Sequence, residues 1–170
     1  SVMPQSEISS ATAPALLRLA LYQPDIPQNA GTIIRMAACF AIPVSIIGPA
    51  GFPVSDRAFR RAGMDYLDAA TIHRHDSWAD FDFWRKKAGA RLILATTRAS
   101  MPHTGFAFRP GDILLMGRET LGVPDEVHAA ADARIRIPMR PTLRSLNLAV
   151  SAAILAAEAL RQLDAFPKET

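Results

Sequence analysis

Cysteine is nearly absent from this sequence, which narrows the chemistry that the protein can perform. Cys39 is the single cysteine in 170 residues, so a disulfide within the chain and a zinc site built from cysteines are both excluded. The four histidines are scattered without the spacing of a metal site, and we expect no bound metal. A reducing, cytoplasmic location is the simplest interpretation.

Long apolar runs and a strong excess of one charge are also missing. No run approaches the roughly 20 residues needed to cross a membrane, and we expect no membrane association. The balance of 19 Lys+Arg against 16 Asp+Glu gives a net charge of +3, which permits a nucleic-acid partner without requiring one. With 49% hydrophobic and 21% charged residues, the composition is typical of a soluble globular domain.

The beginning of the chain differs in composition from the remainder. Residues 1–14 are small and polar, include prolines, and lack the basic and apolar regions of a signal peptide. We expect a disordered tail over 1–14 and a single domain over 15–165. The length suits one domain with a proper core, and no internal repeat or linker divides it.

Short apolar runs alternate with helical patterns along the rest of the chain. This alternation predicts an α/β fold with a mainly parallel sheet and helices on both of its faces. Ligands of such sheets bind beyond the carboxyl ends of the strands, which directs attention to the loops after the last three strands. The expected strands are 16–22, 44–48, 69–75, 91–97, 112–117 and 133–138. The expected helices are 29–40, 55–63, 77–89, 124–131 and 145–163.

A lone arginine, Arg35, lies among small and apolar residues in the first expected helix. Because helical side chains lean toward the N-terminus, Arg35 shares a face with Gly31 and Thr32. Asn29 is a good residue to cap the free N–H groups there, and a helix N-terminus beside a guanidinium suits a phosphate or an oxyanion. The alternative is an arginine that reaches solvent along the helix or pairs with Asp25.

The stretch MGRETLGVP (116–124) follows an expected buried strand. Gly117 and Gly122 allow a backbone to approach a flat ligand such as adenine. Glu119 is then a candidate for binding a ribose hydroxyl or a cation, or for holding the loop. The alternative is an ordinary strand-to-helix loop in which Glu119 pairs with Arg118 or a free N–H. No P-loop, GxGxxG or GxSxG pattern occurs.

The segment from 137 to 162 combines an extended start with a small-residue helix. Two prolines restrict its path, and Arg140 and Arg144 flank a backbone that can offer polar groups to a ligand. We expect Ser145 to begin the last helix with Asn147 in its first turn, and N-capping alone is a sufficient explanation for both. The helix that follows is almost entirely Ala, Leu, Ile and Val, which favours close packing, for example on another subunit.

Together, three stretches resemble the sequence motifs of the SPOUT-class (trefoil-knotted) RNA 2′-O-methyltransferases. They are LYQPDIPQNAGTIIR (21–35), LLMGRETLGVP (114–124) and RIPMRPTLRSLNLAVSAAILAAEALRQ (136–162). The resemblance covers residues 16–163 and is closest to the tRNA (cytidine/uridine-34-2′-O)-methyltransferases. The pattern YxPxIPxNxGxIIR and the segment RRAGxDY, here RRAGMDY (60–66), are specific to that subgroup.

This resemblance implies a fold, a cofactor and partners. The fold is a parallel α/β sheet whose C-terminal segment forms a deep trefoil knot, and the cofactor is S-adenosyl-L-methionine. The family works as a homodimer, with the first and last helices at the interface, and methylates the wobble ribose in the anticodon stem-loop of tRNA. By position, the cofactor-binding residues are Ala95, Thr96, Gly117, Glu119, Gly122, Ile137, Met139, Ser145 and Leu146.

The resemblance also gives Arg35 a role at the target ribose. We predict that Arg35 orients the 2′-hydroxyl or a neighbouring phosphate and helps deprotonation by stabilising alkoxide charge. Asn29, Glu119, Ser145 and Asn147 are expected to hold this geometry.

Two positions depart from the family pattern and leave alternatives open. Ala149 stands where the family often has serine, and Ala157 stands where it usually has tyrosine; the second change concerns the substrate pose rather than the cofactor pocket. One alternative is the same chemistry on another RNA. The others are a non-catalytic RNA-binding relative, which the intact Arg35, Glu119, Ser145 and Asn147 argue against, and a nucleotide-binding regulator that binds adenosine compounds and ignores RNA.

Overall fold

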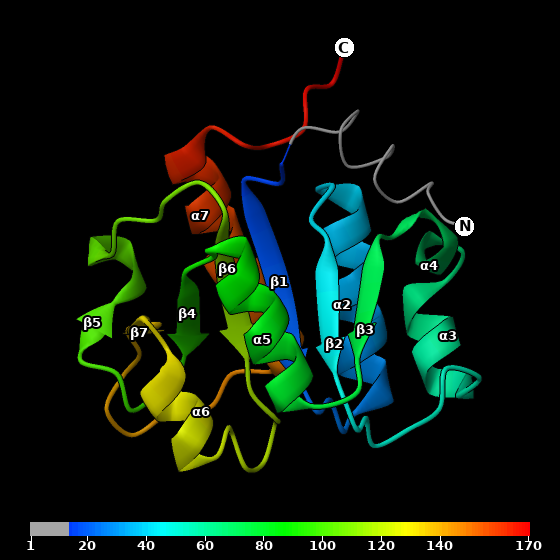
Figure 1. Cartoon of the computed structure of the whole chain (residues 1–170), viewed down its shortest axis with the longest axis horizontal. Helices are drawn as coiled ribbons and strands as arrows, with labels where there is room; N and C mark the ends of the chain where they lie inside the picture. Colours follow the sequence, from blue (N-terminus) through cyan, green and yellow to red (C-terminus); the bar gives the residue numbers. More distant parts are fainter. Residues whose placement is uncertain (1–13) are drawn as a thin grey trace.

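A sheet of seven parallel strands forms the centre of the computed structural model, which describes residues 14–170 (Figure 1). The strands lie in the order β3-β2-β1-β6-β4-β7-β5, and every neighbouring pair is parallel. The tail expected over 1–14 lies outside the described residues except for its last one. The strands are β1 (Leu17–Tyr22), β2 (Val44–Ile47), β3 (Ile72–His75), β4 (Leu92–Ala95), β5 (Met101–Pro102), β6 (Asp112–Met116) and β7 (Ala133–Arg136).

Helices cover both faces of this sheet, which explains why its central strands are so apolar. Leu19 and Leu114 face the layer of α2 and α7, whereas Ala20 and Leu115 face the layer of α5 and α6 (Figure 1). The predicted α/β fold is therefore confirmed. The helices are α2 (Pro27–Cys39), α3 (Arg57–Gly63), α4 (Tyr66–Ala69), α5 (Trp78–Ala88), α6 (Asp125–Ala130), α7 (Leu148–Leu163) and the 3-10 turn η1 (His103–Gly105).

Most predicted elements are confirmed to within a few residues, but the strand expected over 69–75 is half as long. Its first residue, Ala69, instead ends helix α4 (Tyr66–Ala69), and β3 begins only at Ile72. Its neighbour β2 has only four residues, and the pairing runs from Val44↔Ile72 to Ile47↔His75. The short elements β5 and η1 were not predicted, because two or three residues show no periodicity.

Both helices that bear site residues begin elsewhere than expected. The last helix, α7, begins at Leu148 rather than Ser145, because Asn147 is its N-cap and accepts hydrogen bonds from the N–H groups of Ala149 (2.8 Å) and Val150 (3.2 Å). In α2, a proline occupies the first turn and Ile26 at the N-cap supplies no side-chain bond.

Asn29 is therefore not the helix cap that we predicted. It lies inside the first turn of α2, two residues after the helix begins. Its side chain is free to reach another part of the molecule.

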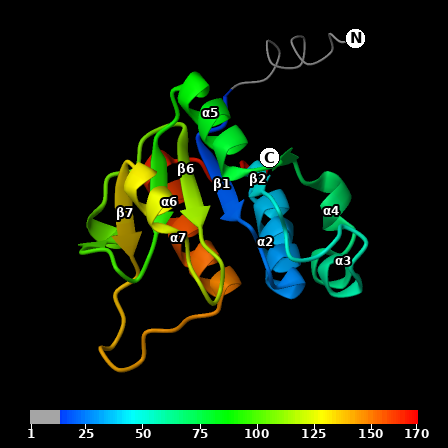
Figure 2. The same ribbon diagram turned by 60° about the horizontal axis from the view of Figure 1, so that its bottom comes forward.

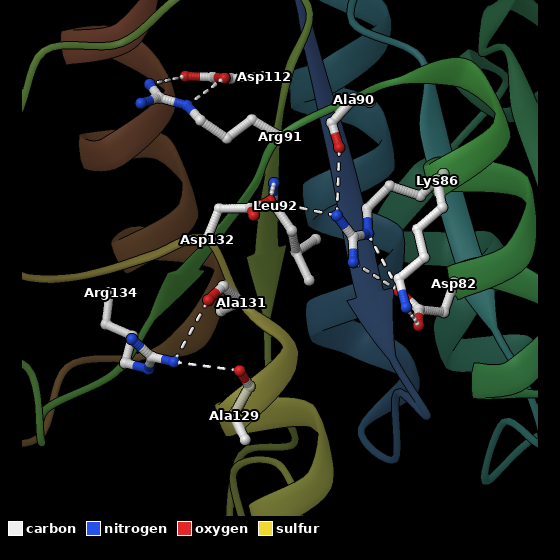
Figure 3. Close-up of polar contacts among 11 residues, drawn as sticks. Asp82, Lys86, Ala90, Arg91, Leu92, Asp112, Ala129, Ala131, Asp132 and Arg134 are labelled. Carbon is white, nitrogen blue, oxygen red and sulfur yellow. Dashed lines mark hydrogen bonds and ion pairs between the residues drawn. The ribbon is translucent and has the colours of Figure 1, made fainter.

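Paired charges lie at the amino ends of β4, β6 and β7 (Figure 3). Asp112, the first residue of β6, is 1% exposed and accepts hydrogen bonds from Arg91 at 2.7 and 2.9 Å. The buried Arg85 of α5 contacts Asp82 at 2.6 Å and Asp132 at 3.1 Å. Because buried charges are tolerated only when they are paired, this end of the sheet serves stability and the carboxyl ends are left for a ligand.

Candidate cofactor and active site

A cavity of about 480 Å³ opens at the carboxyl ends of β4 and β6. Its position obeys the rule for open parallel sheets, because β6 lies beside β1, where the strand order changes direction. Five of the predicted cofactor residues meet in its wall. They are Ala95, Thr96, Gly117, Glu119 and Gly122.

The loop after β6 is closed by its own backbone. Arg118 and Gly122 exchange two N–H···O=C hydrogen bonds of 3.0 Å, and a Cβ at Gly117 would lie 2.9 Å from the carbonyl carbon of Gly122. Gly122 has φ +59°, a conformation that favours glycine. The glycines therefore make the loop tight. The side chain of Arg118 forms no ion pair with Glu119; its guanidinium carbon lies 5.3 Å from the ring centre of Tyr22, and its Nε donates to the carbonyl of Gly122 at 3.0 Å.

A chain of side-chain amides joins this loop to the other two motifs. Asn29 donates from Nδ2 to Oε2 of Glu119 at 2.8 Å, and Asn147 donates from Nδ2 to Oδ1 of Asn29 at 3.0 Å. Because Asn147 also caps α7, this network fixes the start of α7 relative to the start of α2 and to the loop after β6. Three of the predicted site residues are thus brought into direct contact.

A second carboxyl group, Asp25, was missed as a site residue. Its Oδ1 and the Oε1 of Glu119 are buried and find no hydrogen-bond donor in the described part of the chain. Burial, and then the neighbouring Asp25, raise the pKa of Glu119 to about 7, although the hydrogen bond from Asn29 opposes the shift. A proton on Glu119 can therefore be shared with Asp25, which satisfies both oxygens.

Arg35 lies on an exposed face of α2. Its guanidinium carbon is 5.0 Å from the ring centre of Tyr66, and Nη1 is 3.1 Å from Sδ of Met64. The alternative of an ion pair with Asp25 is not observed, and no acid within residues 14–170 pairs with Arg35. Its charge is therefore available to an anion.

The other predicted cofactor-binding residues lie outside the cavity at the carboxyl ends of β4 and β6, which is called the main cavity below. Ile137 and Met139 line a neighbouring cavity of about 310 Å³, and Thr97 lines both. Ser145 and Leu146 line neither, because they lie in the exposed extended segment between β7 and α7, which projects beyond the carboxyl ends of the strands (Figure 2).

Several residues that line the main cavity were not predicted. Thr97 lies in the loop after β4, which the sequence analysis placed at this edge, so its position was an available signal. Leu148 is the first residue of α7 and was expected inside that helix. Within the part of the chain that the structure describes, no helix is long and apolar enough to span a membrane. The same residues contain no group of three side chains arranged to bind a metal ion.

The chain is similar to RNA methyltransferases over nearly all of the described residues. A model of the SpoU rRNA methylase family matches residues 16–157. The tRNA (cytidine(34)-2′-O)-methyltransferase of Beijerinckia indica subsp. indica is 61% identical over 150 residues, which cover 88% of this chain and 94% of that protein.

Solved structures show the same similarity. One is described as "Structural insights into the 2-OH methylation of C/U34 on tRNA" and is 43% identical to this chain. Its TM-score is 0.83, and the match covers 89% of this chain and 99% of the other. The AdoMet-bound rRNA methyltransferase of Sinorhizobium meliloti is 30% identical with a TM-score of 0.81, and it covers 89% of this chain and 58% of the other.

Proposed function

Because the chain belongs to the SpoU rRNA methylase family, we propose that it transfers a methyl group from S-adenosylmethionine to the ribose 2′-hydroxyl of nucleotide 34 of tRNA. The observation that carries this proposal is the similarity to a tRNA (cytidine(34)-2′-O)-methyltransferase. The two sequences are 61% identical over a stretch that covers 94% of that relative. The network of Asn29, Glu119 and Asn147 supports it, because it joins the three motifs at one edge of the sheet.

The cavity at the carboxyl ends of β4 and β6 fits the proposed cofactor. Its volume of about 480 Å³ lies within the range of roughly 300–1,000 Å³ for small-molecule sites. Met116, Val123 and Leu148 supply apolar wall, and the loop after β6 supplies backbone polar groups. When bound, S-adenosylmethionine supplies an electrophilic methyl group. The residues proposed to hold it are, in the wall of this cavity, Ala95, Thr96, Gly117, Glu119 and Gly122. The family resemblance adds Ile137, Met139, Ser145 and Leu146, which lie beyond this wall in the segment after β7.

Arg35 is the residue that we propose acts on the substrate. A ribose hydroxyl is a weak nucleophile, so its reaction needs stabilisation of the charge that develops on oxygen. A guanidinium stays protonated at neutral pH, so Arg35 donates hydrogen bonds to the oxygen or to the adjacent phosphate rather than removing the proton itself. Asn29, Ser145 and Asn147 support the arrangement, and positioning supplies much of the rate.

A homodimer and a trefoil knot belong to the same proposal. An apolar stripe on α7 supports the dimer, because Val150 and Ile154 are 48% and 37% exposed one helical turn apart. Beside this stripe, a groove of about 470 Å³ runs between α2 and α7 and includes Thr32 and Met36. The knot is proposed for the C-terminal segment, as the family resemblance implies. The proposed setting is the cytoplasm, where tRNA is available.

The direct test is transfer of labelled methyl from S-adenosylmethionine to unmodified tRNA, with the product nucleotide mapped by digestion and mass spectrometry. We expect one 2′-O-methyl group at nucleotide 34. A matched tRNA with a 2′-deoxy nucleotide at that position controls for the acceptor oxygen and should receive none. Methylation of another RNA, or cofactor binding without any transfer, would contradict the proposal.

A variant of Arg35 tests the proposed mechanism separately. Arg35→Ala should lower the transfer rate by about 100-fold or more, the scale for loss of a charge-stabilising donor. The affinity for S-adenosylmethionine, measured by calorimetry, should change little because Arg35 does not line the main cavity. Arg74→Ala, an exposed arginine on β3, is the control. A large loss of cofactor affinity in Arg35→Ala would contradict this role.

A further inference from the structure

We propose that Tyr66 is a positioning residue for Arg35, and that Met64 completes the contact. This inference rests on the proposed function, because it concerns how Arg35 is held for methyl transfer. The guanidinium carbon lies 5.0 Å from the ring centre of Tyr66, within the distance of a cation–π contact. Tyr66 begins α4, and Arg35 lies in the middle of α2, so the contact is made between two helices.

An aromatic ring orients a guanidinium without neutralising it. A carboxylate in the same place would pair with Arg35 and compete with an oxyanion or phosphate for its N–H groups. The ring instead lies over one face of the flat guanidinium. The N–H groups at its edge, apart from the one on Nη1 that contacts Met64, are left for the substrate. The absence of an acid partner among the described residues agrees with this arrangement, since the substrate is itself the anion.

The backbone of Met64 provides independent support. This residue has φ 51° and ψ −149°, a conformation that glycine adopts easily and that strains other residues. Its N–H caps α3 by donating to the carbonyl of Arg60 at 2.8 Å, yet its apolar side chain is 50% exposed. Nothing in the core requires a methionine at this strained position. The contact that uses the side chain is the one between Sδ and Nη1 of Arg35, at 3.1 Å.

Two glycines fix the helices that carry these groups. A Cβ at Gly31 would collide with the carbonyl oxygen of Phe59 and would lie 2.8 Å from Cβ of Ala62. A Cβ at Gly63, the last residue of α3, would meet the side chain of Leu67. The close approach of α2, α3 and α4 therefore leaves the ring of Tyr66 and the guanidinium of Arg35 on a rigid support, as a preorganised site requires.

Replacement of Tyr66 tests the inference through the kinetics of methyl transfer to tRNA. Tyr66→Phe keeps the ring and should keep kcat within about twofold, whereas Tyr66→Leu should lower kcat by about tenfold. The KM for tRNA and the Kd for S-adenosylmethionine should stay within about twofold in both. Trp84→Leu removes a similar contact, to Arg18 at 5.5 Å, in the other helix layer, and should leave kcat unchanged.

Met64→Gly separates positioning from folding. Glycine suits the backbone at this position, so the melting temperature should not fall, but the thioether contact is lost and kcat should fall by about threefold. A normal kcat in both Tyr66→Leu and Met64→Gly overturns the inference. An equal loss in Tyr66→Phe and Tyr66→Leu also overturns it, because the hydroxyl would then act on the substrate directly.

A measurement without turnover keeps the two proposals distinguishable. In a spectrum of ¹⁵N-arginine-labelled protein, the Nε–H resonance of Arg35, assigned from Arg35→Lys, should be shifted by the ring and should return toward the value of free arginine in Tyr66→Leu. Unchanged resonances in that variant overturn the contact. A wild-type protein that shows the shift but methylates no tRNA would instead contradict the proposed function.

Discussion

At the scale of single residues, the candidate site depends on partners that are distant in the sequence. The family resemblance grouped Asn29, Glu119, Ser145 and Asn147, and hydrogen bonds in the structure join three of them, Asn29, Glu119 and Asn147. The role of Asn29 was predicted wrongly, because a cap is a local interaction and the amide is used instead to reach Glu119, 90 residues away. Asp25 was weighed only as a partner of Arg35, since nothing local indicates that its carboxyl lies against another one.

The carboxyl of Glu119 should make stability depend on pH. Its pKa is raised from 4.5 to about 7, so the folded state holds this proton more tightly than the unfolded state. Its contribution is therefore complete below about pH 4.5 and declines as pH rises toward 7. Glu119→Gln keeps a neutral group that can donate to Asp25 and accept from Asn29. Wild type should therefore lose stability relative to this variant as the pH rises, so that the melting temperature of Glu119→Gln minus that of wild type increases from about pH 5 to pH 8.

The control for this measurement is Glu126→Gln, which alters an exposed carboxyl on α6. Thermal unfolding followed by circular dichroism at several pH values gives the comparison. If Glu119→Gln and wild type melt in parallel at every pH, the raised pKa of Glu119 is wrong.

At the scale of elements, the loop after β6 and the start of α7 carry the site. The prediction of a glycine loop at this strand end is confirmed, because periodicity and glycine spacing are local signals. The start of α7 was placed three residues too early, since Ser145 and Asn147 are both good caps and only the contact of Asn147 with Asn29 selects between them. The reason for Gly117 also differs from the expectation: it faces the backbone of Gly122.

Gly117→Val should therefore damage cofactor binding through the shape of the loop. The added side chain collides with the backbone of Gly122, 2.9 Å from the Cβ position, so the two loop hydrogen bonds should break. We expect the affinity for S-adenosylmethionine, measured by calorimetry, to fall by at least about tenfold, or roughly 1.4 kcal/mol. Gly105→Ala has only an ordinary contact, 3.6 Å from Sδ of Met101, and should bind normally. Normal affinity in Gly117→Val would remove this loop from the cofactor site.

The exposed stripe of α7 gives a second prediction at this scale. Val150→Glu places a charge on the proposed dimer face, where an unpaired buried carboxylate is strongly unfavourable, and should yield monomers in sedimentation experiments. Val54 has the same exposure of 48% but lies before α3, so Val54→Glu should remain dimeric. Two variants that sediment alike would show that α7 is not the interface.

At the scale of the whole molecule, the two ends of the sheet have different tasks. The amino ends hold the paired charges around Asp112 and Arg85 (Figure 3). The carboxyl ends hold the cavity and the amide network. The alternation of strands and helices was sufficient to predict a ligand site at the carboxyl ends, whereas the paired charges at the amino ends were not predicted. The order of the strands was not predictable in the same way, because pairing between distant strands leaves no periodic signal in the sequence.

This division predicts that stability can be lowered without changing the site. Asp112→Ala leaves Arg91 without its buried partner and should cost about 3 kcal/mol of unfolding free energy, which corresponds to a fall of roughly 10 °C in melting temperature. Well below that temperature, the Kd for S-adenosylmethionine should equal that of wild type. Asp76→Ala, which alters an exposed residue, is the control. A weaker affinity in Asp112→Ala at low temperature would show that the two ends are coupled.

The amide network also bears on when the protein becomes competent during its synthesis. Asn147 meets Asn29 across 118 residues of chain, and helix α7 completes the core against α2. When synthesis has reached residue 140, the residues of all the strands described here have been synthesised. Asn147, whose side-chain amide joins α7 to Asn29, has not yet been added. Binding of the cofactor is therefore expected only after the last helix has left the ribosomal tunnel, so an incomplete chain does not sequester S-adenosylmethionine.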